Sequence, residues 1–174
     1  GCDDLIKFRG QRIQEDIIAM NELGVEFDHL NFTDAAFRSF QKKSIYPTVK
    51  ELFSGNVSEA DEFLKLQVLK VFNNYTNFNK FIIPLSVGKH IDHAIVRNLA
   101  ELAFPKQLIG YYLDFPYALR LGNWSLKNIF KFVTLRKSIK FMSKTKRQIL
   151  NYYSSQIHQL FNNTPSYQEI ILCN

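Results

Sequence analysis

The stretch KFIIPLSVGKHIDHAIVRNLAELAFPKQLIGYYL, residues 80–113, decides the fold class. Its first part, Lys80 to Leu85, is a compact apolar run bounded by turn residues, which is typical of a buried strand. Gly88 ends the loop that follows, and from His90 to Ala103 apolar residues recur at helical spacing. Leu108 to Leu113 is a second short apolar strand. The order strand, helix, strand predicts an α/β domain with a largely parallel sheet.

The segments on either side continue this α/β pattern. Helices are predicted over residues 8–23, 58–75 and 143–161, and strands over residues 25–32 and, as an edge strand, 169–173. Gly24 is the expected stop of the first helix, and Ser58 is the expected N-cap of the second. Residues 124–141 fit either extended or helical structure. We find no internal repeat or linker and therefore predict one domain, residues 1–174.

The composition excludes several classes of protein. Of 174 residues, 46% are hydrophobic and 22% are charged, which excludes a globally disordered chain. Two cysteines at opposite ends of the chain, Cys2 and Cys173, cannot form a disulfide framework or a cysteine-based metal site. No apolar run is long enough to span a membrane, and no secretory signal is visible, so a cytoplasmic location is expected. The net charge of +6 comes with no motif that reads a nucleic-acid groove.

The chemistry concentrates in the loop and helix that follow the first strand of the opening stretch. His90, Asp92 and His93 lie within four residues, beyond the carboxyl end of a strand, where open α/β sheets bind their ligands. The two histidines are three residues apart and share one helix face. A helix N-terminus disfavours imidazolium, so both rings are expected to be neutral, as a metal ligand must be. The pattern indicates a metal or catalytic site, and the alternative is a pair of structural histidines.

Several ordered motifs resemble the PIG-L/LmbE-like zinc-dependent N-acetylglucosaminyl deacetylases. The first is Gly88-Lys-His-Ile-Asp-His-Ala-Ile-Val-Arg97, which is similar to the second signature of that family. The others, in chain order, are Arg12-x-x-Glu15-Asp16, Thr33-Asp34-Ala-Ala-Phe-Arg38, Tyr112-x-Asp114-Phe-Pro-Tyr117 and the helix from Lys146 to Phe161. The resemblance covers most of the chain and implies a Rossmann-like three-layer domain with a mostly parallel sheet.

The resemblance also implies roles for single residues. The last histidine of the signature, matching His93, would bind Zn²⁺, which lowers the pKa of its bound water and polarises the acetamide carbonyl. The first histidine, matching His90, would stabilise the oxyanion or donate a proton to the leaving amine, and Asp92 would tune that histidine. Arg12 and Asp34 would contact the sugar or the group attached to it. The alternatives are an ion pair of Arg12 with Glu15 or Asp16, and an ordinary loop aspartate.

The sequence departs from the family at one place. The His-Pro-Asp-Asp motif, which supplies two further zinc ligands and the general base, is absent from these residues. One histidine cannot hold a catalytic zinc. We therefore expect a fragment of a deacetylase that acts on an N-acetylglucosamine-containing conjugate, lacking an N-terminal strand–helix unit and inactive alone. The alternative is a non-catalytic relative that acts as a carbohydrate-binding or interaction module.

Overall fold

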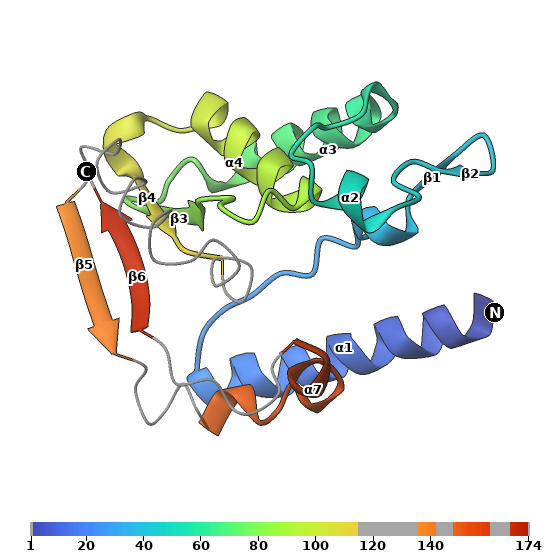
Figure 1. The fold of residues 1–174 in the computed structure, drawn as a ribbon. Helices are drawn as coiled ribbons and strands as arrows, with labels where there is room; N and C mark the ends of the chain where they lie inside the picture. Colours follow the sequence, from blue (N-terminus) through green and yellow to red (C-terminus); the bar gives the residue numbers. More distant parts are fainter. Residues whose placement is uncertain (1, 115–135, 142–147, 161–167, 174) are drawn as a thin grey trace. The chain divides into compact units, whose positions relative to one another are not determined.

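The computed structural model describes residues 2–114, 136–141, 148–160 and 168–173 (Figure 1). The chain divides into two compact units. One unit comprises Gly1–Asn31 and Phe141–Gln168, and the other comprises Phe32–Lys140 and Glu169–Asn174. The single domain expected over residues 1–174 stays a prediction. Among the described residues, no helix is both long enough and apolar enough to cross a membrane.

The first unit is built on α1 (Cys2–Leu23), which begins earlier than the predicted helix and ends where the sequence indicated. Gly24 has a φ of 64°, a left-handed conformation that glycine adopts without steric cost. Its N–H donates to the carbonyl of Asn21, and the N–H of Val25 donates to the carbonyl of Met20. These two bonds are a Schellman motif, so the prediction of Gly24 as the stop is confirmed.

One prediction in this unit is wrong and another holds only in part. The strand predicted for residues 25–32 is neither helix nor strand, and Asn31 has a φ of 58°, which is incompatible with an extended ladder. The helix predicted over residues 143–161 is not continuous, because a turn at residues 151–152 precedes α7 (Ser154–Leu160). The buried carboxylate of Glu15 accepts a hydrogen bond from the N–H of Ser155, which satisfies a donor in the first turn of α7.

The second unit contains the predicted pair of parallel strands. β3 (Phe81–Pro84) pairs with β4 (Ile109–Tyr112) in parallel, with Phe81 opposite Ile109. β6 (Gln168–Cys173) pairs with β4 in the antiparallel sense, and β5 (Arg136–Phe141) follows it in the strand order β3-β4-β6-β5. The strand expected at the tail is thus confirmed, but it lies inside the sheet and not at its edge. Residues 124–135 of the ambiguous segment lie outside the described residues.

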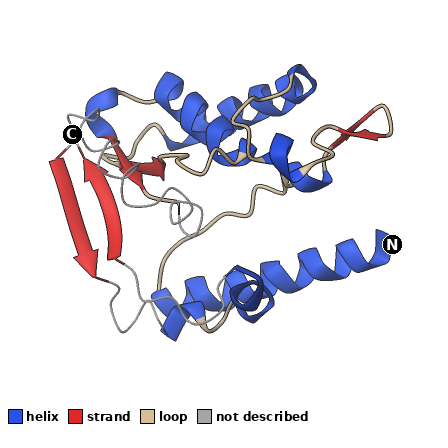
Figure 2. Cartoon of the chain, in the orientation of Figure 1, coloured by secondary structure: helices blue, strands red, loops and turns tan. Residues whose placement is uncertain are grey.

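Helices cover β3 and β4 as the apolar pattern predicted (Figure 2). The helix expected over residues 58–75 consists of α3 (Glu62–Phe72) flanked by the short helices η2 (Glu59–Asp61) and η3 (Asn73–Tyr75). Its expected N-cap is confirmed, because Oγ of Ser58 accepts from the N–H of Ala60. α4 (Ile91–Ala103) packs on α3 and on β3. The buried residues of these elements include Val68, Ile83, Ile91, Ile95, Leu99 and Ile109.

Short elements fill the segment before α3. They are η1 (Ala35–Phe37), a hairpin of β1 (Ser39–Phe40) and β2 (Lys43–Ser44), and α2 (Val49–Leu52). Gln41 and Lys42 both have positive φ, 50° and 65°, as a tight two-residue hairpin requires. Thr48 and Glu51 form a capping box at the start of α2. A further short helix, η4 (Lys106–Leu108), leads into β4.

Candidate functional site

The predicted site lies where β3 leads into α4. The backbone N–H of Leu85 donates to the carbonyl of Tyr112 and extends the β3–β4 ladder by one bond. The chain then turns through Ser86 and Lys89, which both have a φ of 56°. A left-handed conformation is unfavourable for residues other than glycine, so the surrounding contacts must hold this loop in place. The loop delivers His90, Asp92 and His93 to the first turn of α4, as the sequence predicted.

His90 is the N-cap of α4. Its Nδ1 accepts a hydrogen bond of 3.2 Å from the backbone N–H of Asp92, so the neutral ring carries its proton on Nε2. The side chain is buried, with Phe53 packed edge-on at 5.1 Å between ring centroids. Burial lowers the pKa of His90, and the attraction of the nearby Asp92 carboxylate does not offset it. His90 is therefore a neutral imidazole with a proton to donate from Nε2.

His93 has the opposite arrangement of ring nitrogens. Its Nδ1 lies 2.9 Å from Oδ2 of Asp114, and because a carboxylate only accepts, the proton belongs on Nδ1. The lone pair of the neutral ring is then on Nε2, the nitrogen that a metal ligand needs. The centroids of the His90 and His93 rings lie 5.3 Å apart. The site thus combines one imidazole that donates through Nε2 with a neighbour that is a base at the same atom.

Asp114 follows β4 and is 1% exposed. Besides His93, it accepts hydrogen bonds from the backbone N–H groups of Val87, at 3.0 Å, and Gly88, at 3.3 Å. Burial would raise the pKa of this carboxyl, but the hydrogen bonds from His93 and Val87 outweigh burial and lower it. The same carboxylate therefore holds the loop after β3 and the imidazole at the start of α4.

Asp92 joins a buried network of charges. One carboxylate oxygen accepts from the N–H of Ala35 at 2.9 Å, and the other pairs with the guanidinium of Arg38. Arg38 also pairs with Asp61 at 2.9 Å, and the hydroxyl of Tyr46 donates to Asp61 at 2.7 Å. Burial opposes the charge of Arg38, yet Asp92 and Asp61 raise its pKa above the usual value. The network fixes the orientation of Asp92, which acts on His90 through its charge.

Asp34 comes to this site from a different part of the chain. It caps η1 by accepting from the N–H of Ala36, and it offers a ligand atom within 4.8 Å of those of His90 and Asp92. This trio is the group of three potential metal ligands found within the described residues. Its hydrogen bonds favour another use, because both oxygens of Asp92 are engaged and His90 carries its proton on Nε2. A donor and a carboxylate side by side suit the hydroxyl and amide groups of a polar substrate.

Arg12 belongs to the other compact unit and is therefore described within that unit alone. Its guanidinium lies over the ring of Phe8, 5.7 Å from the centroid. The alternative for Arg12 was an ion pair with Glu15 or Asp16. These two carboxylates have other described partners: Glu15 accepts from Ser155, and Asp16 is hydrogen-bonded to His29 and Tyr153. A role of Arg12 toward a sugar stays a prediction.

Sequence reasoning assigned no role to three residues that hold the site, Arg38, Asp61 and Asp114. Arg38 and Asp114 belong to two of the motifs that resemble the deacetylase family, but the sequence indicated no function for either residue. A signal for Asp114 existed, because it comes directly after the strand that is parallel to β3, and the carboxyl ends of parallel strands meet at one edge of a sheet. Asp61 gave no such signal, because an acidic residue in the first turn of a helix is ordinary.

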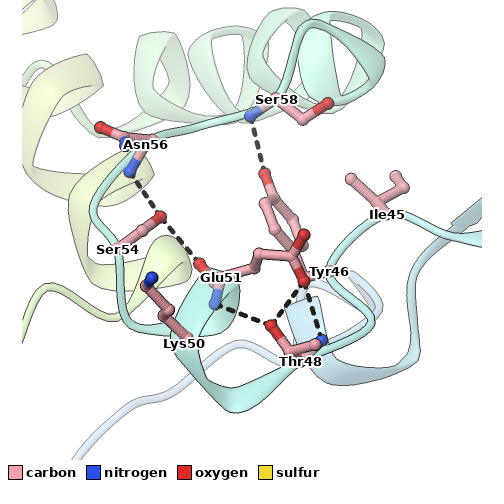
Figure 3. A pocket seen from close by; sticks show the side chains of 8 residues that line it. All are labelled: Ile45, Tyr46, Thr48, Lys50, Glu51, Ser54, Asn56 and Ser58. Carbon is pink, nitrogen blue, oxygen red and sulfur yellow. Dashed lines mark hydrogen bonds between the residues drawn. The ribbon is translucent and has the colours of Figure 1, made fainter.

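A hollow of about 520 Å³ lies beside α2, and eight residues line it (Figure 3). Its polar groups largely bond to one another: Thr48 with Glu51, Ser54 with the backbone of Glu51 and Asn56, and Tyr46 with the N–H of Ser58. These bonds hold the shape of the segment around α2. The histidines of the site are not among the residues that line this hollow.

Comparisons with known proteins were made on sequence and on structure. No family model matches the chain. It is 27% identical over 167 residues to the 2'-N-acetylparomamine deacetylase of Niallia circulans, a match that covers 91% of this chain and 58% of that protein. The chain thus spans little more than half the length of this curated relative. A crystal structure of a deacetylase from the biosynthesis pathway of teicoplanin matches with a TM-score of 0.61 and 20% identity, covering 93% of this chain and 71% of that one. That likeness shows a shared fold.

Proposed function

We propose that these residues are part of a metal-dependent N-deacetylase of the PIG-L/LmbE-like kind, which removes the acetyl group from an acetamido sugar. The observation that carries the proposal is the pair of neighbouring imidazoles with opposite tautomers at the carboxyl end of a parallel strand. Amide hydrolysis needs an activated water and a hydrogen-bond donor for the developing oxyanion, and the two rings are suited to those two tasks. A relative and a structural neighbour that are both named deacetylases support it.

His93 is the proposed zinc ligand, through Nε2. The observation that fits zinc is the buried carboxylate on the opposite ring nitrogen, the arrangement that orients most zinc-bound histidines. When bound there, zinc supplies an acidic water and polarises the acetamide carbonyl. A catalytic zinc takes three protein ligands. We place the other two, and the general base, in a part of the protein that corresponds to the uncovered share of the curated relative, together with the missing strand–helix unit of a Rossmann-like fold.

His90 is proposed to stabilise the oxyanion or to donate a proton to the leaving amine. As a neutral ring, its Nε2–H can bond to the carbonyl oxygen of the acetamide as negative charge develops there. To protonate the leaving amine, the ring would first have to take up a proton and become an imidazolium, because a neutral imidazole is too weak an acid. Asp92, held by Ala35 and Arg38, stabilises the imidazolium that forms if His90 takes up a proton. Its fixed orientation means that little reorganisation accompanies the proton transfer. The oxyanion role uses the neutral ring, which burial of His90 and its lowered pKa favour.

The proposed substrate is an N-acetylated amino sugar attached to a larger group. Asp34, beside His90 and Asp92, would accept a hydrogen bond from a sugar hydroxyl, and Arg12 would contact the sugar or its attached group. The name of the curated relative identifies its own substrate as an N-acetylated aminoglycoside, and we extend that class to this protein. The 174 residues by themselves are expected to show neither tight zinc binding nor deacetylation.

The test is zinc content and acetate release by the full protein that contains these residues. We expect about one bound zinc and release of acetate from 2'-N-acetylparomamine or from N-acetylglucosamine conjugates. His93→Ala should abolish zinc binding, and His90→Ala should retain zinc while lowering kcat about 100-fold or more. His29→Ala is the matched control, because the described hydrogen bond of His29 is to Asp16 and not to a residue of the proposed site, and it should change neither property.

Two outcomes would contradict the proposal. If His93→Ala keeps stoichiometric zinc, His93 is not a ligand. If the full protein binds acetylated amino sugars but releases no acetate with zinc supplied, the chain belongs to the alternative class, a carbohydrate-binding module without catalysis.

A further inference from the structure

We propose that Asp114 is a positioning residue for His93, which sets the tautomer and the orientation of that ring and thereby its affinity for zinc. The inference rests on the proposed function for its use, but its geometry stands independently. Asp114 belongs to a motif for which neither the resemblance nor the comparisons supply a role. It follows β4, whereas the loop and the helix that it joins follow β3.

The carboxylate of Asp114 is held from two sides. Oδ1 accepts from the N–H of Val87 and Oδ2 from the N–H of Gly88. Two backbone donors, one on each oxygen, fix the plane of the carboxylate and define it as an acceptor. The side chain is fully buried, so water does not compete for these bonds. Asp114 is thus more rigidly placed than a surface carboxylate with one partner.

The fixed carboxylate determines the state of His93. With Oδ2 only 2.9 Å from Nδ1, the tautomer protonated on Nδ1 gains a hydrogen bond, whereas the other tautomer would face a carboxylate with a lone pair. The same bond limits rotation of the ring, whose side chain is 27% exposed and lies at the start of a helix. Nε2 then carries the lone pair and the orientation of the ring is restrained, and a metal ligand needs both. Loss of such a partner weakens metal binding by about 10–100-fold in known sites.

A purely structural role for Asp114 would have different consequences. Its bonds to Val87 and Gly88 hold the turn in which Ser86 and Lys89 have positive φ. A substitution that only loosened this turn would lower stability without changing the proton distribution of one imidazole. The ring tautomer of His93 therefore separates the two roles, and it can be read without any metal.

The first measurement is the ¹⁵N spectrum of the histidine rings in the metal-free full protein, above the pH at which the rings titrate. We expect Nδ1 of His93 to be the protonated nitrogen and Nε2 the unprotonated one, and His90 to show the reverse. A His93 ring protonated mainly on Nε2 overturns the inference. This measurement needs no variant, so it remains decisive even if substitutions at Asp114 prevent folding.

The second measurement uses Asp114→Asn, which is nearly the same size. The amide oxygen can keep the 3.0 Å bond from Val87, and the amide nitrogen then donates toward Nδ1 of His93. We expect the proton of His93 to move to Nε2 and the affinity for Zn²⁺ alone to fall about 10–100-fold. Glu101→Gln is the matched control: Glu101 also joins α4 to β4, and its described hydrogen bonds are to Tyr111 and Arg97, so the substitution should leave the tautomer unchanged.

The outcomes separate the inference from the proposed function. A tautomer that changes in Asp114→Asn and not in Glu101→Gln, together with weaker zinc binding, supports the positioning role. A changed tautomer with unchanged zinc affinity overturns the link between the tautomer and zinc. A tautomer that stays the same in Asp114→Asn overturns it. A wild-type full protein that binds no zinc, with the expected tautomer present, overturns the proposed metal function and leaves the positioning geometry standing.

Discussion

Two histidine–carboxylate pairs in this chain have nearly the same length and opposite surroundings. In the second unit, Nδ1 of His93 lies 2.9 Å from Asp114, whose side chain is completely buried. In the first unit, Nε2 of His29 lies 2.7 Å from Asp16, and about a third of each side chain is exposed. Distance alone would rank the pair of His29 and Asp16 as the stronger one. The surroundings reverse that order, because water and salt screen an exposed pair and hardly reach a buried one.

The partners of each carboxylate differ as well. Asp114 is fixed by two backbone N–H groups, which belong to the chain and cannot rotate away. Asp16 has a side-chain partner instead, the hydroxyl of Tyr153. An imidazole beside Asp114 therefore meets an acceptor that the backbone holds, whereas one beside Asp16 meets an acceptor that a side chain holds and that water can reach. Burial of the carboxylate and its backbone donors, more than the contact distance, indicate which histidine–carboxylate pair can hold an imidazole in one tautomer and orientation.

The largest expected difference concerns stability. Asp114→Ala leaves the N–H groups of Val87 and Gly88 and Nδ1–H of His93 without their acceptor inside the protein, which should cost about 3 kcal/mol of unfolding free energy. Asp16→Ala should cost about 1 kcal/mol or less, because water replaces the lost partner. Urea unfolding, monitored by amide hydrogen exchange in each unit, measures the loss of unfolding free energy in both variants. Equal losses for the two variants would show that burial does not distinguish the pairs.

A smaller effect is expected in the coupling within each pair. Double-mutant cycles should give about 2 kcal/mol for His93 with Asp114 and about 0.5 kcal/mol for His29 with Asp16. Raising NaCl from about 0.05 M to about 1 M should abolish the coupling of the exposed pair and leave most of the coupling of the buried one. The comparison fails if both couplings decrease with salt to the same extent.

Much of the scaffold of the site could be predicted from the sequence because local rules decide it. The apolar runs of β3 and β4, the periodicity of α4 and the glycine after α1 each depend on neighbours within a few residues. The predicted strand over residues 25–32 was wrong because a strand also needs a partner, which lies elsewhere in the sequence. The hairpin of β1 and β2 was missed because Gln41 and Lys42 are unusual residues for its left-handed turn.

The residues of the candidate site also fall into those that local sequence predicts and those that depend on distant parts of the chain. His90, Asp92 and His93 could be found from their spacing, since one helix turn brings them together. That His90 is a helix N-cap, and so carries its proton on Nε2, depends on the boundary of α4 to within one residue. Arg38, Asp61 and Asp114 were not assigned, because Arg38 meets Asp92, Asp61 meets Arg38 and Asp114 meets His93 through contacts 21 to 54 residues apart along the chain. For Asp114 alone, its position after the second parallel strand was a usable signal. Long-range hydrogen bonds leave no trace in local spacing.

The smallest expected effect concerns a buried carboxylate of the first unit whose hydrogen bonds, like those of Asp114, include a backbone donor. Glu15 neighbours Asp16 in α1 but is buried, and it accepts from the N–H of Ser155 and from the hydroxyls of Ser154 and Ser155. Burial raises its pKa, yet these hydrogen bonds prevail and lower the pKa below the ordinary 4.5. A lowered pKa means that the ionised form stabilises the fold above about pH 4.5, and that this contribution is lost as the pH falls through the folded-state pKa.

Glu15→Gln removes that titration while keeping one acceptor oxygen. The variant should be less stable than the wild type by about 1 kcal/mol at pH 7. The difference should shrink as the pH falls below 4.5, because the wild-type carboxyl becomes protonated and neutral as well. Asp16→Asn is the matched control and should show a smaller pH-dependent difference, since its carboxylate is more exposed. A constant difference between pH 7 and pH 3 would mean that the backbone donor at Ser155 does not select the charged form of Glu15. Glu15 shares burial and a backbone donor with Asp114, so that result would mean that these two features do not explain the difference between Asp114 and Asp16.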